Sequence, residues 1–174
     1  MTYGNVQLGH TAHVPSGKSF PLSLLAADVT DPVNIGGLFR LADALGVRHI
    51  YLTGASTTPQ NPKVRRSARA TQQYVSWSYA QDALRLIKEL KSSGQRILAL
   101  EITSASADIR HVAISPDVPI VLIVGSENQG IAQELLNESE QTVHIPMLGQ
   151  NSSMNVVVAS AIAVFEITKE LSAT

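Results

Sequence analysis

Short apolar runs alternate with amphipathic stretches along most of the chain. Apolar runs that are bounded by glycine, proline or polar residues are typical of buried strands, and apolar residues at helical spacing indicate helices. The pattern predicts strands over residues 21–29, 48–52, 74–79, 96–102, 119–124 and 141–145. It predicts helices over residues 34–45, 82–91, 131–136 and 156–165. Alternating strands and helices favour an α/β fold with a mostly parallel sheet and helices on both faces.

The 174 residues fit a single domain. Residues 1–20 are polar and irregular, and we expect a loosely held N-terminal arm there. Residues 21–174 should form one domain, because no linker, repeat or low-complexity tract interrupts them. A chain of this size buries roughly 70% of its unfolded surface, so it needs no disulfide or metal to fold.

The stretch from Ile145 to Phe165 combines a polar loop with the most apolar predicted helix. Its loop contains Gly149, Asn151 and Ser153, and its helix has almost no polar face. A helix that is apolar all round is normally buried. We therefore expect a small polar ligand in this loop, at the helix N-terminus, with the buried helix holding the loop in place.

The predicted helix after residue 33 has two glycines in its first turn. Asn34 is a favourable N-cap residue, while Gly36 and Gly37 each cost about 1 kcal/mol relative to alanine. Glycines at a helix N-terminus let a ligand or phosphate approach the backbone amides. Arg40 lies off the apolar stripe, so both a surface ion pair with Asp43 and a functional role are open.

Composition excludes several classes of protein. The chain has no cysteine, which rules out disulfides and thiolate chemistry, and its net charge is −1. His10 and His13 lie three residues apart without further candidate ligands, so we expect no metal site. Neither a signal peptide nor an apolar run long enough to span a membrane is present, which predicts a cytoplasmic protein without a membrane segment.

One segment is strongly basic. Lys63, Arg65, Arg66 and Arg69 fall within seven positions, although the chain as a whole is nearly neutral. Such a cluster is either a solvated face or a nucleic-acid contact. Loops at the carboxyl ends of strands, such as residues 103–107, are where α/β sheets bind ligands.

Three stretches in a fixed order resemble a known family. They are NIGGLFR from residue 34, GSENQGI from residue 125 and IPMLGQNSSMNVVVASA from residue 145. They are similar to the three motifs of the SpoU (TrmH-like) branch of the SPOUT-class RNA 2′-O-ribose methyltransferases, and the resemblance covers residues 22–169. No G-x-G-x-x-G or P-loop sequence occurs, which removes the warrant for a nucleotide-dependent oxidoreductase.

The resemblance implies an α/β domain whose C-terminal third forms a deep trefoil knot, a feature that periodicity cannot reveal. It implies S-adenosylmethionine as cofactor, held by loops near residues 100–104, 125–130 and 145–155. It also implies a homodimer through the last helix, which would suit the spacing of Ala159 and Ala163. The cofactor residues so assigned are Leu100, Thr103, Gly125, Glu127, Gly130, Ile145, Met147, Ser153, Met154 and Asn155.

The resemblance also implies the catalytic residues. Arg40 matches the family's catalytic arginine, which would act as a base or as a cation that orients the ribose hydroxyl and lowers its pKa. Asn34 would position Arg40 or a phosphate, and Glu127 would orient the site. Ser153 and Asn155 would hold the arginine, the ribose or the charged end of the cofactor.

Two departures from the family limit what can be transferred. Many relatives carry an N-terminal RNA-binding domain or a basic C-terminal extension, and neither is expected here. Contact with tRNA or rRNA should therefore rest on the basic cluster, with Tyr74, Trp77 and Lys18 as weaker candidates. Arg69 stands where the family often has glycine.

The alternative to a methyltransferase is a non-catalytic RNA-binding or assembly factor that keeps the fold.

Overall fold

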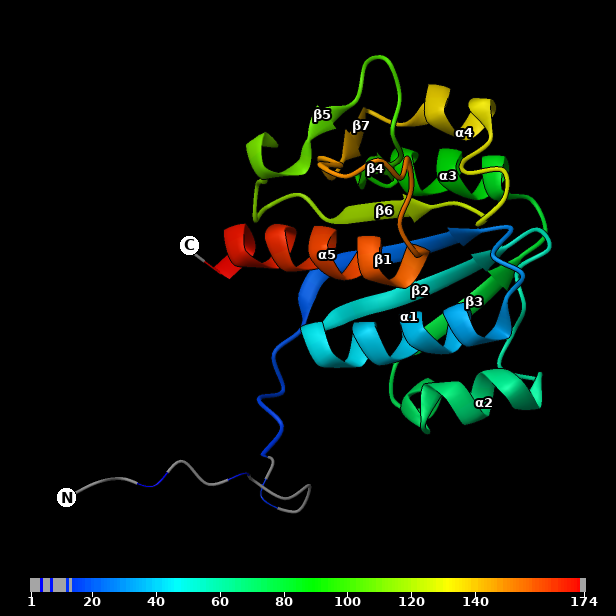
Figure 1. The fold of residues 1–174 in the computed structure, drawn as a ribbon, viewed down its shortest axis with the longest axis vertical. Helices are drawn as coiled ribbons and strands as arrows, with labels where there is room; N and C mark the ends of the chain where they lie inside the picture. The colour runs from blue at the N-terminus through cyan, green and yellow to red at the C-terminus, as the bar shows by residue number, and fades with distance from the viewer. Residues whose placement is uncertain (1–3, 5–6, 8–11, 13, 173–174) are drawn as a thin grey trace.

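The computed structural model describes residues 4, 7, 12 and 14–172. Its centre is a parallel sheet with the strand order β3-β2-β1-β6-β4-β7-β5 (Figure 1). The strands are β1 (Phe20–Ala27), β2 (Val47–Thr53), β3 (Ser76–Ala80), β4 (Arg96–Leu100), β5 (Ala107–Asp108), β6 (Ile120–Val124) and β7 (Gln141–His144). Every pairing within this sheet is parallel, which confirms the predicted fold class.

Helices cover both faces of the sheet. They are α1 (Pro32–Leu45), α2 (Pro62–Ala68), α3 (Ala83–Ser92), α4 (Gln133–Glu138) and α5 (Val156–Ser172), with short 3-10 turns at Thr71–Gln73 and Ile109–His111. Helices α1, α2 and α5 lie on one face, and α3 and α4 lie on the other (Figure 1). Most predicted elements are confirmed within a few residues, whereas α2 and β5 were not predicted.

The central strands β1 and β6 are almost entirely apolar because both of their faces are buried. In β6, Leu122 packs into the core under α1 and α5, while the neighbouring Ile123 packs into the core under α3 and α4. Strand β1 alternates in the same way, with Leu24 on one face and Leu25 on the other. Continuous apolar runs of this kind are typical of central parallel strands.

Helix α1 begins earlier than predicted. Asp31 is its N-cap and accepts a hydrogen bond from the backbone N–H of Val33 at 2.8 Å, and Pro32 occupies the first turn. Proline is favoured at the first helical position because its missing N–H would be unpaired there anyway. The prediction of Asn34 as the cap is therefore wrong. Asn34 lies inside the helix and is only 7% exposed.

The two glycines of α1 serve helix packing. A Cβ atom on Gly36 would lie 1.9 Å from the hydroxyl oxygen of Ser67 in α2, and one on Gly37 would lie 2.8 Å from a methyl group of Val157 in α5. Both glycines therefore let neighbouring helices approach α1 closely. The expectation that a ligand or phosphate occupies this space is wrong, because protein atoms fill it.

Helix α5 is longer than predicted and only partly buried. Ala163 and Val164 are fully buried in the chain's own core, whereas Val158, Ile162 and Phe165 are 51%, 38% and 56% exposed. These three residues form an apolar row on one side of the helix, which we call the α5 stripe. Ala163 faces inward, so the expected use of Ala159 and Ala163 as an interface pair is not how this helix is arranged.

Several predictions concern parts of the chain that the structure covers incompletely. His10 and His13 lie outside the described residues, as does half of the N-terminal arm, while residues 14–19 are exposed and belong to no helix or strand. None of the described helices has the length and apolar character needed to cross a membrane. The trefoil knot stays a prediction.

Candidate functional site

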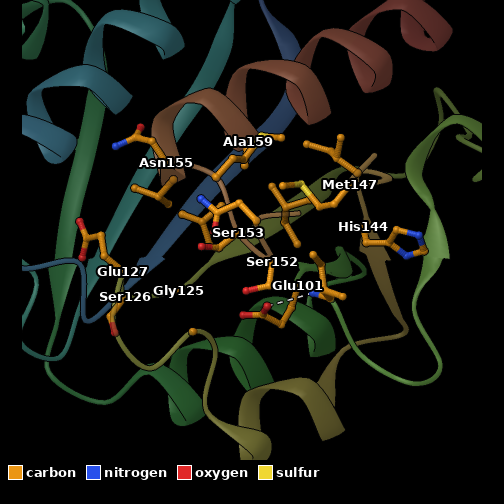
Figure 2. A pocket seen from close by; sticks show the side chains of 18 residues that line it. Glu101, Gly125, Ser126, Glu127, His144, Met147, Ser152, Ser153, Asn155 and Ala159 are labelled. Carbon is orange, nitrogen blue, oxygen red and sulfur yellow. Dashed lines mark hydrogen bonds between the residues drawn. The ribbon is translucent and has the colours of Figure 1, made fainter. Parts of the chain in front are cut away.

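A pocket of about 570 Å³ lies at the carboxyl ends of β4, β6 and β7, next to the N-terminus of α5 (Figure 2). Its walls come from the three loops that leave these strands. Leu100, Val124 and His144, the last residues of the three strands, all line it. The carboxyl edge of a parallel sheet is the usual ligand position in α/β folds, and the volume suits a small-molecule ligand.

Nearly all residues expected to hold a cofactor line this pocket. The lining includes Leu100, Gly125, Glu127, Gly130, Ile145, Met147, Ser153, Met154 and Asn155. Thr103 is the exception, because it belongs to a turn in which its backbone N–H bonds to the hydroxyl of Ser106 at 3.0 Å. The structure thus brings the three loops together at one pocket, and the roles of their residues in cofactor binding stay predictions.

The loop after β6 is a tight turn that only glycine allows. Ser126 and Gly130 exchange two backbone hydrogen bonds, of 3.2 and 2.9 Å. A Cβ atom on Gly125 would lie 2.3 Å from the carbonyl carbon of Gly130, and Gly130 itself has a φ of 66°. This close contact keeps the turn narrow and leaves Glu127 at the pocket wall.

Glu101 is a pocket residue that sequence reasoning missed. One carboxylate oxygen accepts a hydrogen bond from the N–H of Ile131 at 3.1 Å, and the other accepts one from the N–H of Ile102 at 2.9 Å. The side chain thereby joins the end of β4 to the loop after β6. A carboxylate directly after an apolar strand was the available signal, but the strand was predicted to continue through it.

Three polar side chains from distant parts of the chain form a hydrogen-bonded row. The amide nitrogen of Asn34 donates to the carboxylate of Glu127, and the amide oxygen of Asn34 accepts from the amide nitrogen of Asn155 at 3.0 Å. Asn155 also caps α5, since its side-chain oxygen accepts from the N–H of Val157 at 2.9 Å. The row links α1, the loop after β6 and the start of α5, and its ends reach the pocket wall.

Arg40 lies apart from this pocket. Its side chain is exposed on α1, it is absent from the pocket lining, and within the described part of the chain it forms neither a hydrogen bond nor an ion pair with Asp43. It lies one helical turn from Gly37, which touches Val157 of α5. Arg40 is therefore on the side of α1 that borders α5.

The basic cluster lies on α2 and its C-terminal end. Lys63, Arg65, Arg66 and Arg69 are all exposed, and none of them forms a salt bridge among the described residues. Asn61 caps this helix by accepting from the N–H of Lys63 at 2.9 Å, which with Pro62 is a helix-start signal that the prediction overlooked.

The aromatic candidates near the cluster differ in exposure. Tyr74 is 73% exposed and follows the short turn after α2. Trp77 packs edge-on against Phe39 of α1, with ring centroids 6.3 Å apart, so it belongs to the core and is a poor platform for a base. Lys18 donates to the hydroxyl of Ser172 at the end of α5.

Among the described residues, the ionisable groups outside the pocket do not indicate a second active site or a metal site. No group of three or more potential metal ligands occurs among the described residues. Burial lowers the pKa of His49 and raises the pKa of Tyr51, both on β2. The ring of His49 contacts the hydroxyl of Ser76 and the ring of Tyr51. The guanidinium of Arg110 lowers the pKa of Asp108 through a surface ion pair.

Together these features define an α/β domain with a small-molecule site at the carboxyl edge of its sheet, closed on one side by the start of the C-terminal helix. A model of the SpoU rRNA Methylase family matches residues 21–165, and the chain belongs to that family. The match includes the three pocket loops and the Asn34–Glu127–Asn155 row.

Individual relatives agree with this assignment. The tRNA (guanosine(18)-2′-O)-methyltransferase of Escherichia coli K12 is 29% identical over 152 residues, which cover 86% of this chain and 63% of that protein. An AdoMet-bound rRNA methyltransferase from Sinorhizobium meliloti has 28% identity and a TM-score of 0.80, covering 90% of this chain and 58% of that one. This chain spans less than two thirds of the length of the curated relatives it matches first.

One solved structure is matched over almost its whole length. It is described as giving insight into the 2-OH methylation of C/U34 on tRNA, and it has 25% identity and a TM-score of 0.77. The similarity covers 88% of this chain and 97% of that one.

Proposed function

We propose that this protein transfers a methyl group from S-adenosylmethionine to a ribose 2′-hydroxyl of tRNA or rRNA. The observation that carries the proposal is the meeting of the three family motifs at one pocket, where Asn34, Glu127 and Asn155 are joined by hydrogen bonds. Membership of the SpoU rRNA Methylase family supports it.

The pocket's residues fit a cofactor with an adenosine and a charged amino-acid end. Leu100, Ile102 and Met147 supply apolar surface for a flat base, and the loops at Gly125 and Ile145 supply backbone polar groups. Ser152 and Ser153, together with the carboxylates, supply polar partners for hydroxyl and amino groups. When bound, S-adenosylmethionine supplies an electrophilic methyl group.

The chain's own residues would prepare the ribose. A ribose hydroxyl is a poor nucleophile at neutral pH, so it must be aligned and must lose its proton. The guanidinium of Arg40 stabilises the developing alkoxide, while Asn34 and Glu127 orient the pocket wall next to it. Ser153 and Asn155 hold the ribose or the amino-acid end of the cofactor.

Arg40 also bears on the oligomeric state that we propose. Arg40 borders α5 and is absent from the pocket lining of its own chain, so in this proposal the ribose binds where α1, α5 and the pocket mouth meet. The α5 stripe is apolar and exposed, and a second copy of the chain would cover it. A homodimer through α5 would thus bring Arg40 to a protein interface next to the pocket.

The exposed basic residues of α2 form the surface for RNA in this proposal. Arginine and lysine contact phosphates, while sequence-specific enzymes of RNA generally reach single-stranded loops whose riboses are accessible. The relatives named above act on tRNA and rRNA, and we propose RNA of this class as the substrate in the cytoplasm.

The experiment separates cofactor binding from transfer. Arg40→Ala should reduce ribose methylation of total tRNA or rRNA by about 100-fold or more, because the developing alkoxide loses its cation, while calorimetric affinity for S-adenosylmethionine stays within about twofold of wild type. Arg85→Ala, which removes an exposed arginine from α3, is the matched control. Full activity in Arg40→Ala would refute the catalytic role, and an unmodified RNA pool with no cofactor binding would favour the non-catalytic alternative.

A further inference from the structure

The pocket is lined by acidic side chains without basic ones to balance them. Glu101 and Glu127 both contribute to its wall, whereas neither lysine nor arginine is among its lining residues in the described chain. His144 is the remaining ionisable group there, and its Nδ1 lies 2.9 Å from the hydroxyl of Ser106. The two carboxylates therefore face the pocket without a lysine or arginine beside them.

Both carboxylates are held in fixed positions. Glu101 is tied by the N–H groups of Ile102 and Ile131, and Glu127 is tied by the amide of Asn34. Neither carboxylate has a cationic partner among the salt bridges of the described residues. Their charges therefore act on whatever occupies the pocket and are not neutralised by a neighbouring side chain.

A methyl transfer changes the charge of the cofactor. The sulfonium form carries a net charge of +1 at neutral pH, and the thioether that remains once the methyl group has moved to the ribose oxygen is neutral overall, while the displaced proton comes from the ribose hydroxyl. Two fixed negative charges at the pocket wall attract the first and not the second. Coulomb attraction at the edge of a protein is only partly screened by water, so these carboxylates favour the charged form of the cofactor.

Resting on the proposed function, we propose that Glu101 sets the preference of this pocket for the cationic cofactor over its neutral product. Glu101 lies outside the catalytic residues assigned above, so its effect is on binding. The neutral product is then released more readily than the substrate form. The Glu101 side chain also joins the loops at residues 102 and 131 through its hydrogen bonds, a structural role that we call the brace. Its effect on ligand preference and its role as the brace can be measured separately.

Calorimetry of purified protein at pH 8 separates them. The probes are S-adenosylmethionine, S-adenosylhomocysteine and sinefungin, whose added amino group restores the positive charge without a sulfonium. In Glu101→Gln the preference for S-adenosylmethionine over S-adenosylhomocysteine should fall about tenfold, and sinefungin should weaken together with S-adenosylmethionine. Glu101→Asp keeps the charge and should keep the preference even if it loosens the brace.

Matched measurements decide the outcome. Glu134→Gln removes an exposed carboxylate from α4 outside the pocket and should leave the preference unchanged. If Glu101→Gln loses the same affinity for all three ligands and keeps the preference, Glu101 has only its structural role in bracing the loops, and the proposal is overturned.

If Glu101→Gln is unfolded by circular dichroism, the wild-type preference for S-adenosylmethionine should still fall as salt rises from about 0.05 to 0.5 M. A preference that stays constant with salt would overturn the proposal. Wild-type protein that binds none of the ligands would contradict the proposed function itself.

Discussion

Asn34 needs an amide because it faces a different kind of partner on each side. Its nitrogen donates to the carboxylate of Glu127, and its oxygen accepts from Asn155. Aspartate has the same shape but lacks the donor, and leucine lacks both groups. The residue is nearly buried, so an unmet hydrogen bond there is costly.

Asn34→Asp should therefore destabilise the fold in a pH-dependent way. It places a second carboxylate against Glu127, which raises the pKa of the pair above that in the unfolded chain. A raised carboxyl pKa means that stability is retained at low pH and is lost as pH rises through the folded pKa. We expect a loss of about 1 to 3 kcal/mol at pH 8 and a smaller loss at pH 4.5, measured by urea unfolding.

The control for that comparison is Asn137→Asp on the exposed side of α4. Asn137 accepts a hydrogen bond from Gln133 at 2.8 Å, and aspartate can still accept it. This variant should lose little stability at either pH. An Asn34→Asp variant that is equally destabilised at pH 4.5 and pH 8 would show that lost packing, and not carboxylate repulsion, is the cause.

At the level of the element, α2 ends in an unusual backbone conformation. Arg69 and Ala70 have φ values of 51° and 70°, in the left-handed region that glycine adopts more easily. Arg69 is the C-cap of α2, a position where glycine is common. The chain thus carries a strained arginine at the end of its basic helix, in the place where the sequence comparison expected glycine.

Two substitutions that remove the same charge should change stability in opposite directions. Arg69→Gly should stabilise the protein by about 1 kcal/mol, since it relieves a left-handed residue, whereas Arg66→Gly should destabilise it by about 1 kcal/mol, since it puts glycine inside a helix. If the basic cluster contacts RNA, both variants should weaken RNA binding similarly. Thermal unfolding and filter binding measure the two effects, and equal stability changes would contradict the backbone argument.

The elements also show what the sequence could and could not predict. Periodicity found most of the strands and helices because each depends on local side chains. The partners of Gly36 and Gly37 are Ser67 and Val157, which lie far away in the sequence, so the glycines were misread as ligand contacts. Glu101 was missed for a similar reason, since its bond to Ile131 forms only once two strands lie side by side.

For the molecule as a whole, the order of strands explains why the motifs meet. Strands β6, β4 and β7 are neighbours although they are formed in a different order along the chain, so their carboxyl ends present three loops to one pocket. Local patterns carry no information on that order, and the resemblance to a family supplied it. The pocket is complete within one chain, but Arg40 and the α5 stripe remain outside it.

We predict that cofactor binding and methyl transfer depend differently on the proposed homodimer, because the pocket lies within one chain whereas Arg40 is absent from its lining. Ile162→Lys puts a charge in the middle of the α5 stripe and should shift the protein to a monomer in sedimentation experiments, because burying an unpaired charge in an apolar interface is unfavourable. The monomer should keep its affinity for S-adenosylmethionine, since one chain supplies the whole pocket. Its transfer to RNA should fall at least about tenfold, because Arg40 loses the interface that positions it.

Val118→Lys provides the comparison that makes this result interpretable. Val118 is 37% exposed and Ile162 is 38% exposed, so both substitutions place a lysine at an apolar site of similar accessibility, but Val118 lies outside α5. This variant should remain a dimer with full transfer activity. A monomeric Ile162→Lys protein that methylates RNA at the wild-type rate would show that Arg40 reaches the ribose within its own chain, and the α5 stripe would then need another role.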